Sequence, residues 1–577
     1  MRKSNSQSAK IQMRMLAVMA LLLCCFVVVV VRAFSIQVNG KAFYQNQGEI
    51  RHVKEVEMPV SRGAIYDRNG EPLALSTAMQ SVGIVPNKLL DQFSKVEQLA
   101  EVLNLDAEEL KQIITTRTDR QFLFIERRIT PMMADAVQAL NMQGVEFRTE
   151  YKRFYPSGEI LSNVVGFTNV EDQGQEGLER TYDNWLTGIA GKKTVVKDLM
   201  GHAVADIDVD EIKAPKPGKD LYLSIDRRLQ YAAYLALKKS VYQYQAKSGS
   251  VVVLDVTTGE ILAMANMPAF NPNGSKADNI GWRNRAVTDI YEPGSVMKPF
   301  AIVAALESGQ YNRDSVIDTS PGVYEVDGFV IHDFRDYGKL SLEDILVKSS
   351  NIGVAKLVLE VGKEHLWDVY QRFGFGQSTG SGFIGESAGY LPPHHRWRTV
   401  DHAALSRGYN LSVTTLQLAM AYSVFANEGR FRAPTFIKNS LNEERAIIDP
   451  FMAAEVSEML SHVVTDNANH RAGLSNYSVA GKTGTARIAE KGGYSDNYMA
   501  SFVGFAPVSS PRLVVAVNIN SPQGDAYYGG QIAAPLFAEV MKTGLRLLNV
   551  PADLAVPETK QPELKEQTAK RAEDNHG

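Results

Sequence analysis

The sequence predicts an α+β protein that is attached to a membrane by one N-terminal helix. Two apolar runs between Ser250 and Ala265 surround a Thr-Gly turn, which predicts a β-hairpin. Long segments with helical spacing follow, and two further strand-like runs come late in the chain. The helical segments are 296–308, 343–360 and 413–427, and the strand-like runs are 501–505 and 512–519.

Length and composition exclude several classes of protein. The 577 residues allow roughly three or four domains. A hydrophobic fraction of 45% and a charged fraction of 22% exclude a disordered, collagen-like or polytopic membrane protein. The net charge of −4 offers no basic face for nucleic acid. Both cysteines, Cys24 and Cys25, lie in the apolar N-terminal run, and the ten histidines lack metal-ligand spacing, which excludes disulfide scaffolds and predicts no metal site.

Met15–Val31 is an uninterrupted apolar segment bounded by arginines. At about 1.5 Å per residue it covers roughly 25 Å, the short end for a bilayer crossing, and Ala33 and Phe34 extend it. We therefore predict a transmembrane anchor over residues 15–34. A cleaved signal peptide is the alternative, but no small-x-small cleavage site follows. Four of the five basic residues in 1–33 precede the span, which predicts a cytoplasmic tail over 1–14 and an exported remainder.

A mixed pattern follows the anchor. Ser61–Gly70 predicts a short strand that ends in an Asn-Gly turn, and residues 88–145 have helical spacing. Pro215–Gly218 predicts a domain boundary, after which the hairpin and the long helices begin. The last stretch, 551–577, has no aromatic residue and many charges, which predicts a disordered tail.

Ser295 begins a Ser-x-x-Lys sequence, with Lys298 one helical turn further on the same face. Pro293-Gly294 ends the preceding structure, so we expect Ser295 at a helix N-terminus. A serine becomes a strong nucleophile when a neighbour takes its proton, and a lysine with a lowered pKa can do so. For this motif taken alone, an N-cap serine followed by a surface lysine is the simpler interpretation.

Two further motifs favour the catalytic interpretation. Serine penicillin-recognising enzymes combine Ser-x-x-Lys with Ser-x-Asn and Lys-Thr-Gly. Here Ser349-Ser350-Asn351 follows Ser295 by 54 residues, and Lys482-Thr483-Gly484-Thr485 opens an extended segment after both. Other matches fit less well by position, namely Lys247 before the serine, Lys542 in a helical pattern, Ser495 in a turn after Lys482, and Ser440.

With these motifs, the sequence resembles the class B penicillin-binding proteins, and most closely the septal, FtsI-type transpeptidases of Gram-negative bacteria. The resemblance extends from the anchor to about residue 550 and includes Arg62–Gly70, Arg153–Gly158, Gly177–Glu179, Met264–Pro268 and Gly504–Pro507. It implies a pedestal of the dimerisation type over 35–220. It also implies a D,D-transpeptidase domain over 221–550, with a five-stranded antiparallel sheet between helical groups.

The resemblance also implies roles for single residues. Ser295 would be the acylated nucleophile, Lys298 its general base and Ser349 a proton relay. Asn351 would contact the ligand amide, and Lys482 would supply the electrostatics of the site. Main-chain N–H groups of Ser295 and Thr485 would form the oxyanion hole. The remaining ligand contacts would be Thr483, Gly484, Thr485, Arg487, Tyr409, Tyr527 and Tyr528. For Arg62, Asp67, Arg153 and Glu176 we expect salt bridges and turns between domains.

The implied reaction is acyl transfer without cofactor or metal. Ser295 attacks the penultimate D-alanyl carbonyl of a peptidoglycan stem peptide, and the amine of a second stem then takes the acyl group. β-Lactams would trap the acyl-enzyme. The implied location is the inner membrane at the division septum, with the catalytic domain in the periplasm. A septal SEDS-family polymerase and other divisome proteins are the implied partners.

Three alternatives stay open. An elongation-specific transpeptidase or a D,D-carboxypeptidase would share the fold, although a large pedestal and a single anchor disfavour the carboxypeptidase. A β-lactam sensor or a division scaffold would not be an enzyme, and residues 1–14 are too short for a sensor's output domain. One departure is notable, because septal relatives carry an aromatic-Gly-Tyr-Gly string where this chain has Arg407-Gly-Tyr409-Asn410. Arg407 and Asn410 should therefore alter the pocket wall and the β-lactam profile.

Overall fold

The chain divides into two compact units in a computed structural model that describes residues 4–39, 53–197, 203–206, 213–274, 281–440, 442–466, 471–490 and 492–555. The first unit consists of residues 1–61, 80–150 and 188–218. The second consists of residues 62–79, 151–187 and 219–577 and contains the catalytic motifs. The predicted tail over 551–577 lies outside the described residues from 556 onward.

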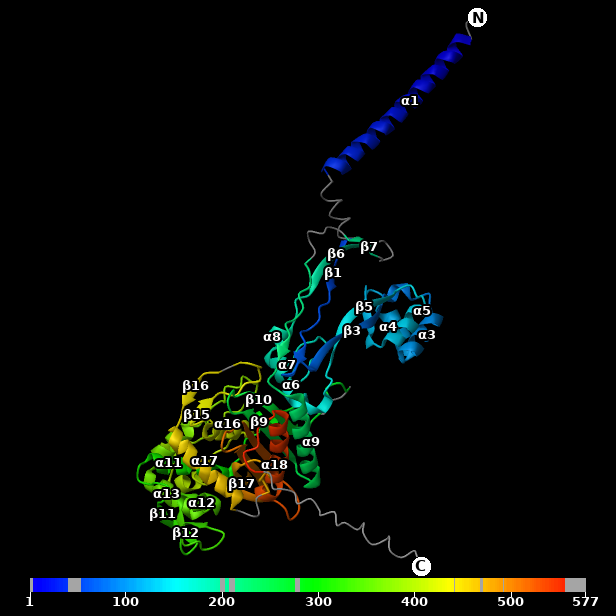
Figure 1. Cartoon of the computed structure of the whole chain (residues 1–577). Helices are drawn as coiled ribbons and strands as arrows, with labels where there is room; N and C mark the ends of the chain where they lie inside the picture. Colours follow the sequence, from blue (N-terminus) through cyan, green and yellow to red (C-terminus); the bar gives the residue numbers. More distant parts are fainter. Residues whose placement is uncertain are drawn as a thin grey trace, which may run out of the picture. The chain divides into compact units, whose positions relative to one another are not determined.

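The first unit begins with helix α1, Ser4–Phe34, which continues into a π-helical turn over Ser35–Asn39 (Figure 1). Its side chains from Ile11 onward are almost all apolar and exposed. Within the described ranges, Ile11–Val38 is the one helix that is long and apolar enough to cross a membrane. This helix is consistent with the predicted single anchor over 15–34.

Three helices form the core of the first unit together with two strands. The helices are α3 (Phe93–Leu103), α4 (Ala107–Thr116) and α5 (Pro131–Ala139), and the strands are β3 (Pro72–Ile84), through its last residues, and β4 (Leu123–Ile129). Asp106 caps α4 through the N–H groups of Glu108 and Glu109. Strand β4 interrupts the helical spacing predicted for 88–145, because it pairs with β3, a partner that is distant in sequence. A separate antiparallel sheet joins β1 (Val53–Met58), β6 (Gly191–Lys197) and β7 (Ala203–Asp206).

The second unit is built on a five-stranded antiparallel sheet, which confirms the predicted fold. Its order is β10 (Ile261–Met267), β9 (Ser248–Asp255), β19 (Leu513–Asn520), β18 (Gly493–Ala506) and β17 (Ala480–Glu490). Alternate residues of β9 enter two different cores, Val251 and Val253 on one face, Val252 and Leu254 on the other. Both faces are covered, so the strand is apolar along most of its length rather than alternating.

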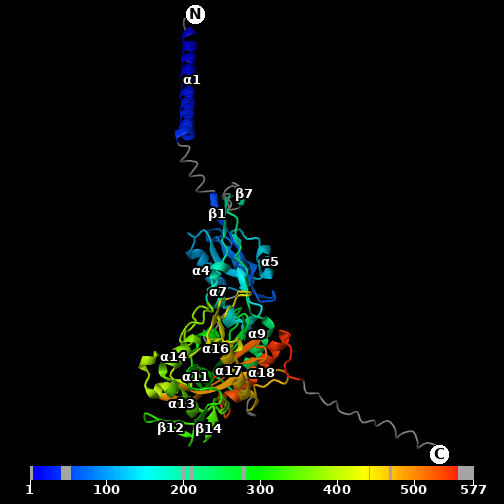
Figure 2. The same ribbon diagram turned by 60° about the vertical axis from the view of Figure 1, so that its left-hand side comes forward.

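Helices cover the two faces of this sheet. One face packs against α9 (Arg227–Gln243) and α18 (Gly529–Leu547), which also contact each other (Figures 1 and 2). The other face packs against α16 (Thr415–Ala426), which is buried along its whole length and correspondingly apolar on all sides. Helices α11 (Lys298–Glu307) and α17 (Pro450–Thr465) belong to the same core as α16.

Shorter elements complete the second unit. The helices are α6 (Ser162–Val165), α7 (Gly177–Thr181), α8 (Asp183–Leu186), α10 (Arg285–Thr288), α12 (Leu342–Val347), α13 (Asn351–Val361), α14 (Lys363–Arg372) and α15 (Thr399–Leu405). The strands are β2 (Ile65–Tyr66), β8 (Leu221–Tyr222), β11 (Val316–Asp318), β12 (Val323–Val326), β13 (Phe329–His332), β14 (Lys339–Ser341), β15 (Arg430–Arg432) and β16 (Glu444–Ala446), and β5 (Val145–Phe154) runs from the first unit into the second.

A buried ion cluster lies within the second unit. Glu179, fully buried, accepts hydrogen bonds from Nε of Arg62 and Nε of Arg153, both at 2.7 Å. Arg62 also donates to Asp183 Oδ1 at 2.7 Å. Asp67 accepts from main-chain N–H groups of its own turn, those of Asn69 and Glu71. These residues form salt bridges and turns, and all of them belong to one compact unit.

Candidate active site

The three sequence motifs meet at the side chain of Ser349. Nζ of Lys298 donates to Ser349 Oγ at 3.1 Å, to the Ser349 carbonyl oxygen at 2.5 Å and to Asn351 Oδ1 at 2.9 Å. Nζ of Lys482 donates to the same Ser349 Oγ at 3.2 Å. Two lysine amines from a helix and a distant strand therefore share one hydroxyl group.

Ser295 lies in a 3₁₀ turn over Gly294–Met297, directly before α11. The buried Tyr422 hydroxyl donates to the Val296 carbonyl at 2.8 Å and thereby stabilises this turn. Ser295 is half-buried, and within the described part of the chain its hydroxyl makes no hydrogen bond. The Lys298 amine, which we expected to reach Ser295, bonds Ser349 and Asn351 instead. The Ser295 hydroxyl is thus left available to a ligand.

Burial determines the charge of the two amines. Burial lowers the pKa of Lys298 well below the ordinary 10.5, and the positive charge of Lys482 lowers this pKa further. The carboxylate of Asp333 raises it, and the charge of Arg407 lowers it. Burial also lowers the pKa of Lys482, to about 8. Two amines on one buried hydroxyl favour one neutral and one charged partner. Lys298 is the amine with the stronger tendency to be neutral, so it can accept a proton, while Lys482 keeps its charge at neutral pH.

A break between two helices places Ser349 in the site. Helix α12 ends at Val347 and α13 begins at Asn351, so the helix predicted over 343–360 is two helices. Between them Ser349 takes a left-handed conformation with φ of 55°, which is uncommon for a residue with a side chain. Ser350 caps α13 by accepting the N–H of Gly353 at 2.9 Å. The turn aims the Ser349 hydroxyl at both lysines.

Asp333 supports this break, and sequence reasoning missed it. Its carboxylate accepts from the Ser350 hydroxyl at 2.5 Å and from the main-chain N–H groups of Asn351 at 2.5 Å and Ile352 at 3.2 Å. It thereby occupies the N-terminus of α13, where a negative charge is stabilised. Asp333 directly follows β13, and no local signal in the sequence links it to residues seventeen positions further on.

Strand β17 brings Lys482 to the site and packs against the Ser295 turn. A Cβ added to Gly484 would lie 2.6 Å from the Pro293 carbonyl oxygen and 2.4 Å from Ser501 Oγ. The space beside the Cα of Gly484 is therefore filled by protein, and a ligand can meet Gly484 only through main-chain groups. Thr483 and Thr485 are half-buried, and Thr485 Oγ1 accepts the N–H of Gly529 at 3.0 Å.

The predicted pocket residues form two aromatic groups. Tyr498 stacks on Tyr527 with ring centres 4.3 Å apart, and Tyr527 donates to the Tyr528 hydroxyl at 3.1 Å. The exposed Arg487 guanidinium lies 6.0 Å from the Tyr498 ring. Tyr409 meets Tyr494 edge-on at 5.7 Å and belongs to the other group.

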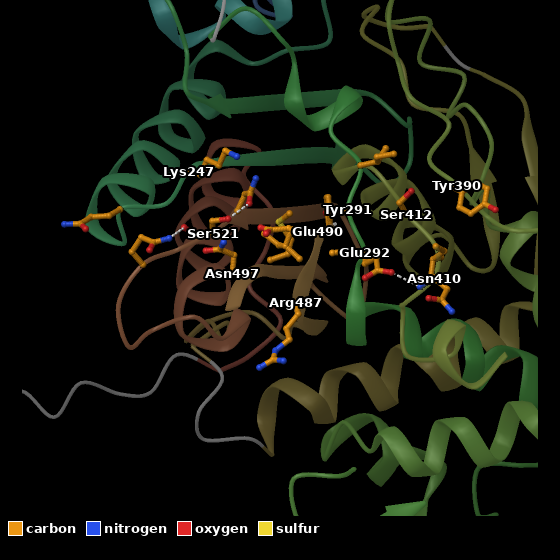
Figure 3. Close-up of a pocket in the computed structure, with 18 residues that line it drawn as sticks. Lys247, Tyr291, Glu292, Tyr390, Asn410, Ser412, Arg487, Glu490, Asn497 and Ser521 are labelled. Atoms are coloured by element: carbon orange, nitrogen blue, oxygen red, sulfur yellow. Dashed lines mark hydrogen bonds between the residues drawn. The ribbon is translucent and has the colours of Figure 1, made fainter. Parts of the chain in front are cut away.

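A cavity of about 780 Å³ adjoins the segment before Ser295. Figure 3 shows Glu292, Asn410 and Arg487 among the residues that line it, and none of the lysines or serines of the three motifs is among them. Glu292 accepts the N–H of Asn410 at 2.8 Å, and burial raises the pKa of its carboxyl group. Sequence reasoning did not select Glu292, although it stands three residues before Ser295. Among the described residues, no group of three or more histidines, cysteines, aspartates or glutamates could hold a metal ion.

Comparison with known proteins places the chain in a family. The model of the penicillin-binding protein transpeptidase domain matches residues 249–542, and that of the penicillin-binding protein dimerisation domain matches residues 57–223. The chain is 41% identical over 544 residues to the probable peptidoglycan D,D-transpeptidase PbpC of Pseudomonas aeruginosa, covering 94% of this chain and 96% of that protein. It is 38% identical to the peptidoglycan D,D-transpeptidase FtsI of Escherichia coli over 527 residues, 90% of this chain and 89% of that one.

Solved structures agree with this result. The crystal structure of penicillin-binding protein 3 from Mycobacterium tuberculosis, complexed with aztreonam, superposes with a TM-score of 0.67 at 27% identity over 87% of this chain and 99% of that one. The chain therefore belongs to the penicillin-binding protein transpeptidases that carry a dimerisation domain, and it is a serine-type peptidoglycan D,D-transpeptidase.

The packing at Gly408 yields a test of how the Ser295 turn is positioned. Gly408 has φ of 81°, and a Cβ there would lie 2.1 Å from the Gly294 carbonyl oxygen. We expect Gly408→Ala to displace this turn and to slow acylation by a β-lactam on the order of 100-fold, because misplacement by about 1 Å has such effects. Gly382→Ala is the matched control, since Gly382 has φ of 73° with open space around it. It should lose only about 1–2 kcal/mol of unfolding free energy. Equal acylation rates in the two variants, with urea unfolding measured alongside, would contradict this account.

Proposed function

We propose that the chain is the septal peptidoglycan D,D-transpeptidase of its cell and that Ser295 carries the acyl group. The observation that carries the proposed chemistry is the pair of buried lysines that share Ser349 Oγ, with one of them, Lys298, three residues after a serine whose hydroxyl makes no hydrogen bond to the described residues. Acyl transfer at a serine requires a nucleophilic hydroxyl and a base that takes its proton. Here the components would be Ser295, a neutral lysine as base and a charged lysine as electrostatic partner.

In the first step Ser295 Oγ attacks the carbonyl carbon of the penultimate D-alanine. Lys298 takes the hydroxyl proton, either directly or through Ser349 Oγ, which it already contacts. The N–H groups of Ser295 and Thr485 stabilise the negative charge that develops on the carbonyl oxygen. The carbon–nitrogen bond then breaks, and the proton passes to the departing amine of the terminal D-alanine.

In the second step the amine of another stem peptide attacks the acyl-enzyme. Lys298 again accepts a proton, and Ser295 regains its own as the ester bond breaks. We assign the ligand amide to Asn351 and the terminal carboxylate to Thr483 and Thr485, with the charge of Lys482 nearby. Gly484, Arg487, Tyr409, Tyr527 and Tyr528 would line the rest of the pocket. A β-lactam would acylate Ser295 in the same way and remain bound.

The septal role and the cellular location are supported by two observations. Helix α1 contains an apolar segment with the length and composition of a single anchor, and the four basic residues before residue 15 favour a cytoplasmic N-terminus. The similarity to a protein named FtsI favours division. We assign residues 1–14 to the cytoplasm, 35–220 to the pedestal and 221–550 to the catalytic domain, which lies in the periplasm. The protein as a whole is anchored in the inner membrane at the septum. A SEDS-family polymerase and other divisome proteins are the proposed partners.

Labelling with a fluorescent penicillin tests the nucleophile. We expect the exported protein to be labelled on Ser295, and the label to vanish in Ser295→Ala because no other hydroxyl occupies the same position. Mass spectrometry of the labelled peptide identifies the site. Ser495→Ala is the matched control, because Ser495 belongs to a motif-like sequence in β18, and it should keep full labelling. Label on a folded Ser295→Ala protein would remove Ser295 from the mechanism.

The pH dependence of acylation tests the two lysines. The rate should rise with pH while Lys298 loses its proton, at a pH well below 10.5 since its pKa is lowered. The rate should fall again above about pH 8, where Lys482 loses its charge. Stopped-flow acylation by a chromogenic β-lactam measures this profile, with tryptophan fluorescence as a check of folding at each pH. A rate that keeps rising toward pH 10.5 would refute the assigned charge of Lys482.

Depletion in cells tests the septal role. Cells that lose a division enzyme grow into filaments, whereas cells that lose an elongation enzyme become spheres. We expect filaments, rescued by the wild-type chain and not by Ser295→Ala. Spherical cells would assign the chain to elongation, and rescue by Ser295→Ala would make it a scaffold in the septum.

A further inference from the structure

Arg407 is a half-buried cation that forms no ion pair with the residues that the structure describes. Its Nε donates to the Ala403 carbonyl at 3.1 Å. In the part of the chain that the structure describes, its two Nη atoms make no hydrogen bond and no carboxylate lies within 4 Å of the guanidinium group. Burial lowers the pKa of Arg407, as expected for a charge that has lost water without gaining a partner. By contrast, the buried Arg62 and Arg153 both pair with Glu179.

The guanidinium group lies near two aromatic rings and one residue before Gly408, which contacts the Ser295 turn. Its Cζ is 6.0 Å from the ring centre of Phe329 and 5.8 Å from that of Tyr409. The next residue, Gly408, accepts the N–H of Gly294 at 3.1 Å, directly before Ser295. The charge of Arg407 is also felt by Lys298. Arg407 is therefore close to the reacting groups.

Asp333, the carboxylate whose charge acts on Arg407, is already occupied. Asp333 accepts three hydrogen bonds from Ser350, Asn351 and Ile352 at the start of α13. Glu292 accepts from the N–H of Asn410 and from the Tyr494 hydroxyl through Oε1 alone, and burial raises the pKa of its carboxyl group, which favours the neutral form. A planar guanidinium with free Nη donors is suited to bind a carboxylate through two parallel hydrogen bonds. The missing anion is therefore one that a ligand can supply.

We propose that Arg407 binds a carboxylate on the acyl donor, on the acyl side of the bond that Ser295 attacks. The proposal rests on Ser295 as the nucleophile. We place the carboxylate on the acyl side because of the position of Asn351, which we assign to the ligand amide. Nδ2 of Asn351 donates to the His332 carbonyl at the end of β13. Phe329, one of the two rings beside Arg407, begins the same strand. The enzyme thus selects donors whose residue before the penultimate D-alanine carries a free carboxylate.

Two penicillins that differ by one carboxylate test this proposal. Carbenicillin is benzylpenicillin with a carboxylate on the acyl side chain. We expect Arg407→Gln to reduce the second-order acylation rate of carbenicillin about tenfold more than that of benzylpenicillin, the size of one charge-assisted hydrogen bond. Arg407→Lys keeps the charge but not the two parallel donors, and it should show a smaller selective loss. Arg398→Gln, at an exposed arginine on the same segment, should leave the ratio of the two rates unchanged.

The ratio of the two acylation rates separates binding of the carboxylate by Arg407 from an indirect effect of its charge on Lys298. Removing the charge of Arg407 should raise the pKa of Lys298 and shift the acid side of both pH profiles equally, so rates are compared across the full profile. If Arg407→Gln reduces the acylation rates of both penicillins by the same factor, the proposal is overturned while Ser295 stays the nucleophile. Should the glutamine variant not fold, the same comparison is made with Arg407→Lys. Failure of the wild-type protein to react with either penicillin would instead overturn the proposed function.

Discussion

Two lysine amines share one buried hydroxyl, and most features of the catalytic unit serve this contact. Placing Lys298 and Lys482 together without water costs several kcal/mol unless one of them gives up its proton. The cost falls on Lys298, whose pKa is lowered by burial and by the charge of Lys482. The lowered pKa of Lys298 is thus a consequence of packing. It requires that the hydroxyl of Ser349 stay between the two amines.

Holding that hydroxyl in position requires both a helix break and a rigid sheet. The left-handed Ser349 is stabilised because Ser350 and Asp333 cap the helix that follows it. On the other side, β17 is paired along its length with β18, so Lys482 cannot shift without disturbing the sheet. Gly484 lets this strand lie directly against Pro293. The three motifs come from separate elements, and close packing fixes their distances.

Buried and half-buried arginines of the same unit differ in whether a carboxylate pairs with them. At Glu179, Arg62 and Arg153 bind the two oxygens of one carboxylate, and Arg62 also pairs with Asp183, which joins residues distant in sequence. At Arg407 the guanidinium group is left without such a partner. A charge that folding leaves uncompensated costs stability, and binding of an anion recovers that cost. The structural role of Arg62 and Arg153 and the ligand-binding role proposed for Arg407 thus correspond to a difference in their carboxylate partners.

The sequence alone determined the local features: the anchor, the β9–β10 hairpin, the late strands and the three motifs in order. Apolar periodicity and turn residues are properties of neighbouring positions, so they can be read without the fold. Strand β4, the break at Ser349, the capping role of Asp333 and the half-buried Glu292 could not be predicted, since each depends on a partner distant in sequence. Only the tertiary structure decided which amine contacts which hydroxyl and that, among the described residues, no carboxylate pairs with Arg407. Those outcomes depend on distance and dehydration, which residue types and spacing do not specify.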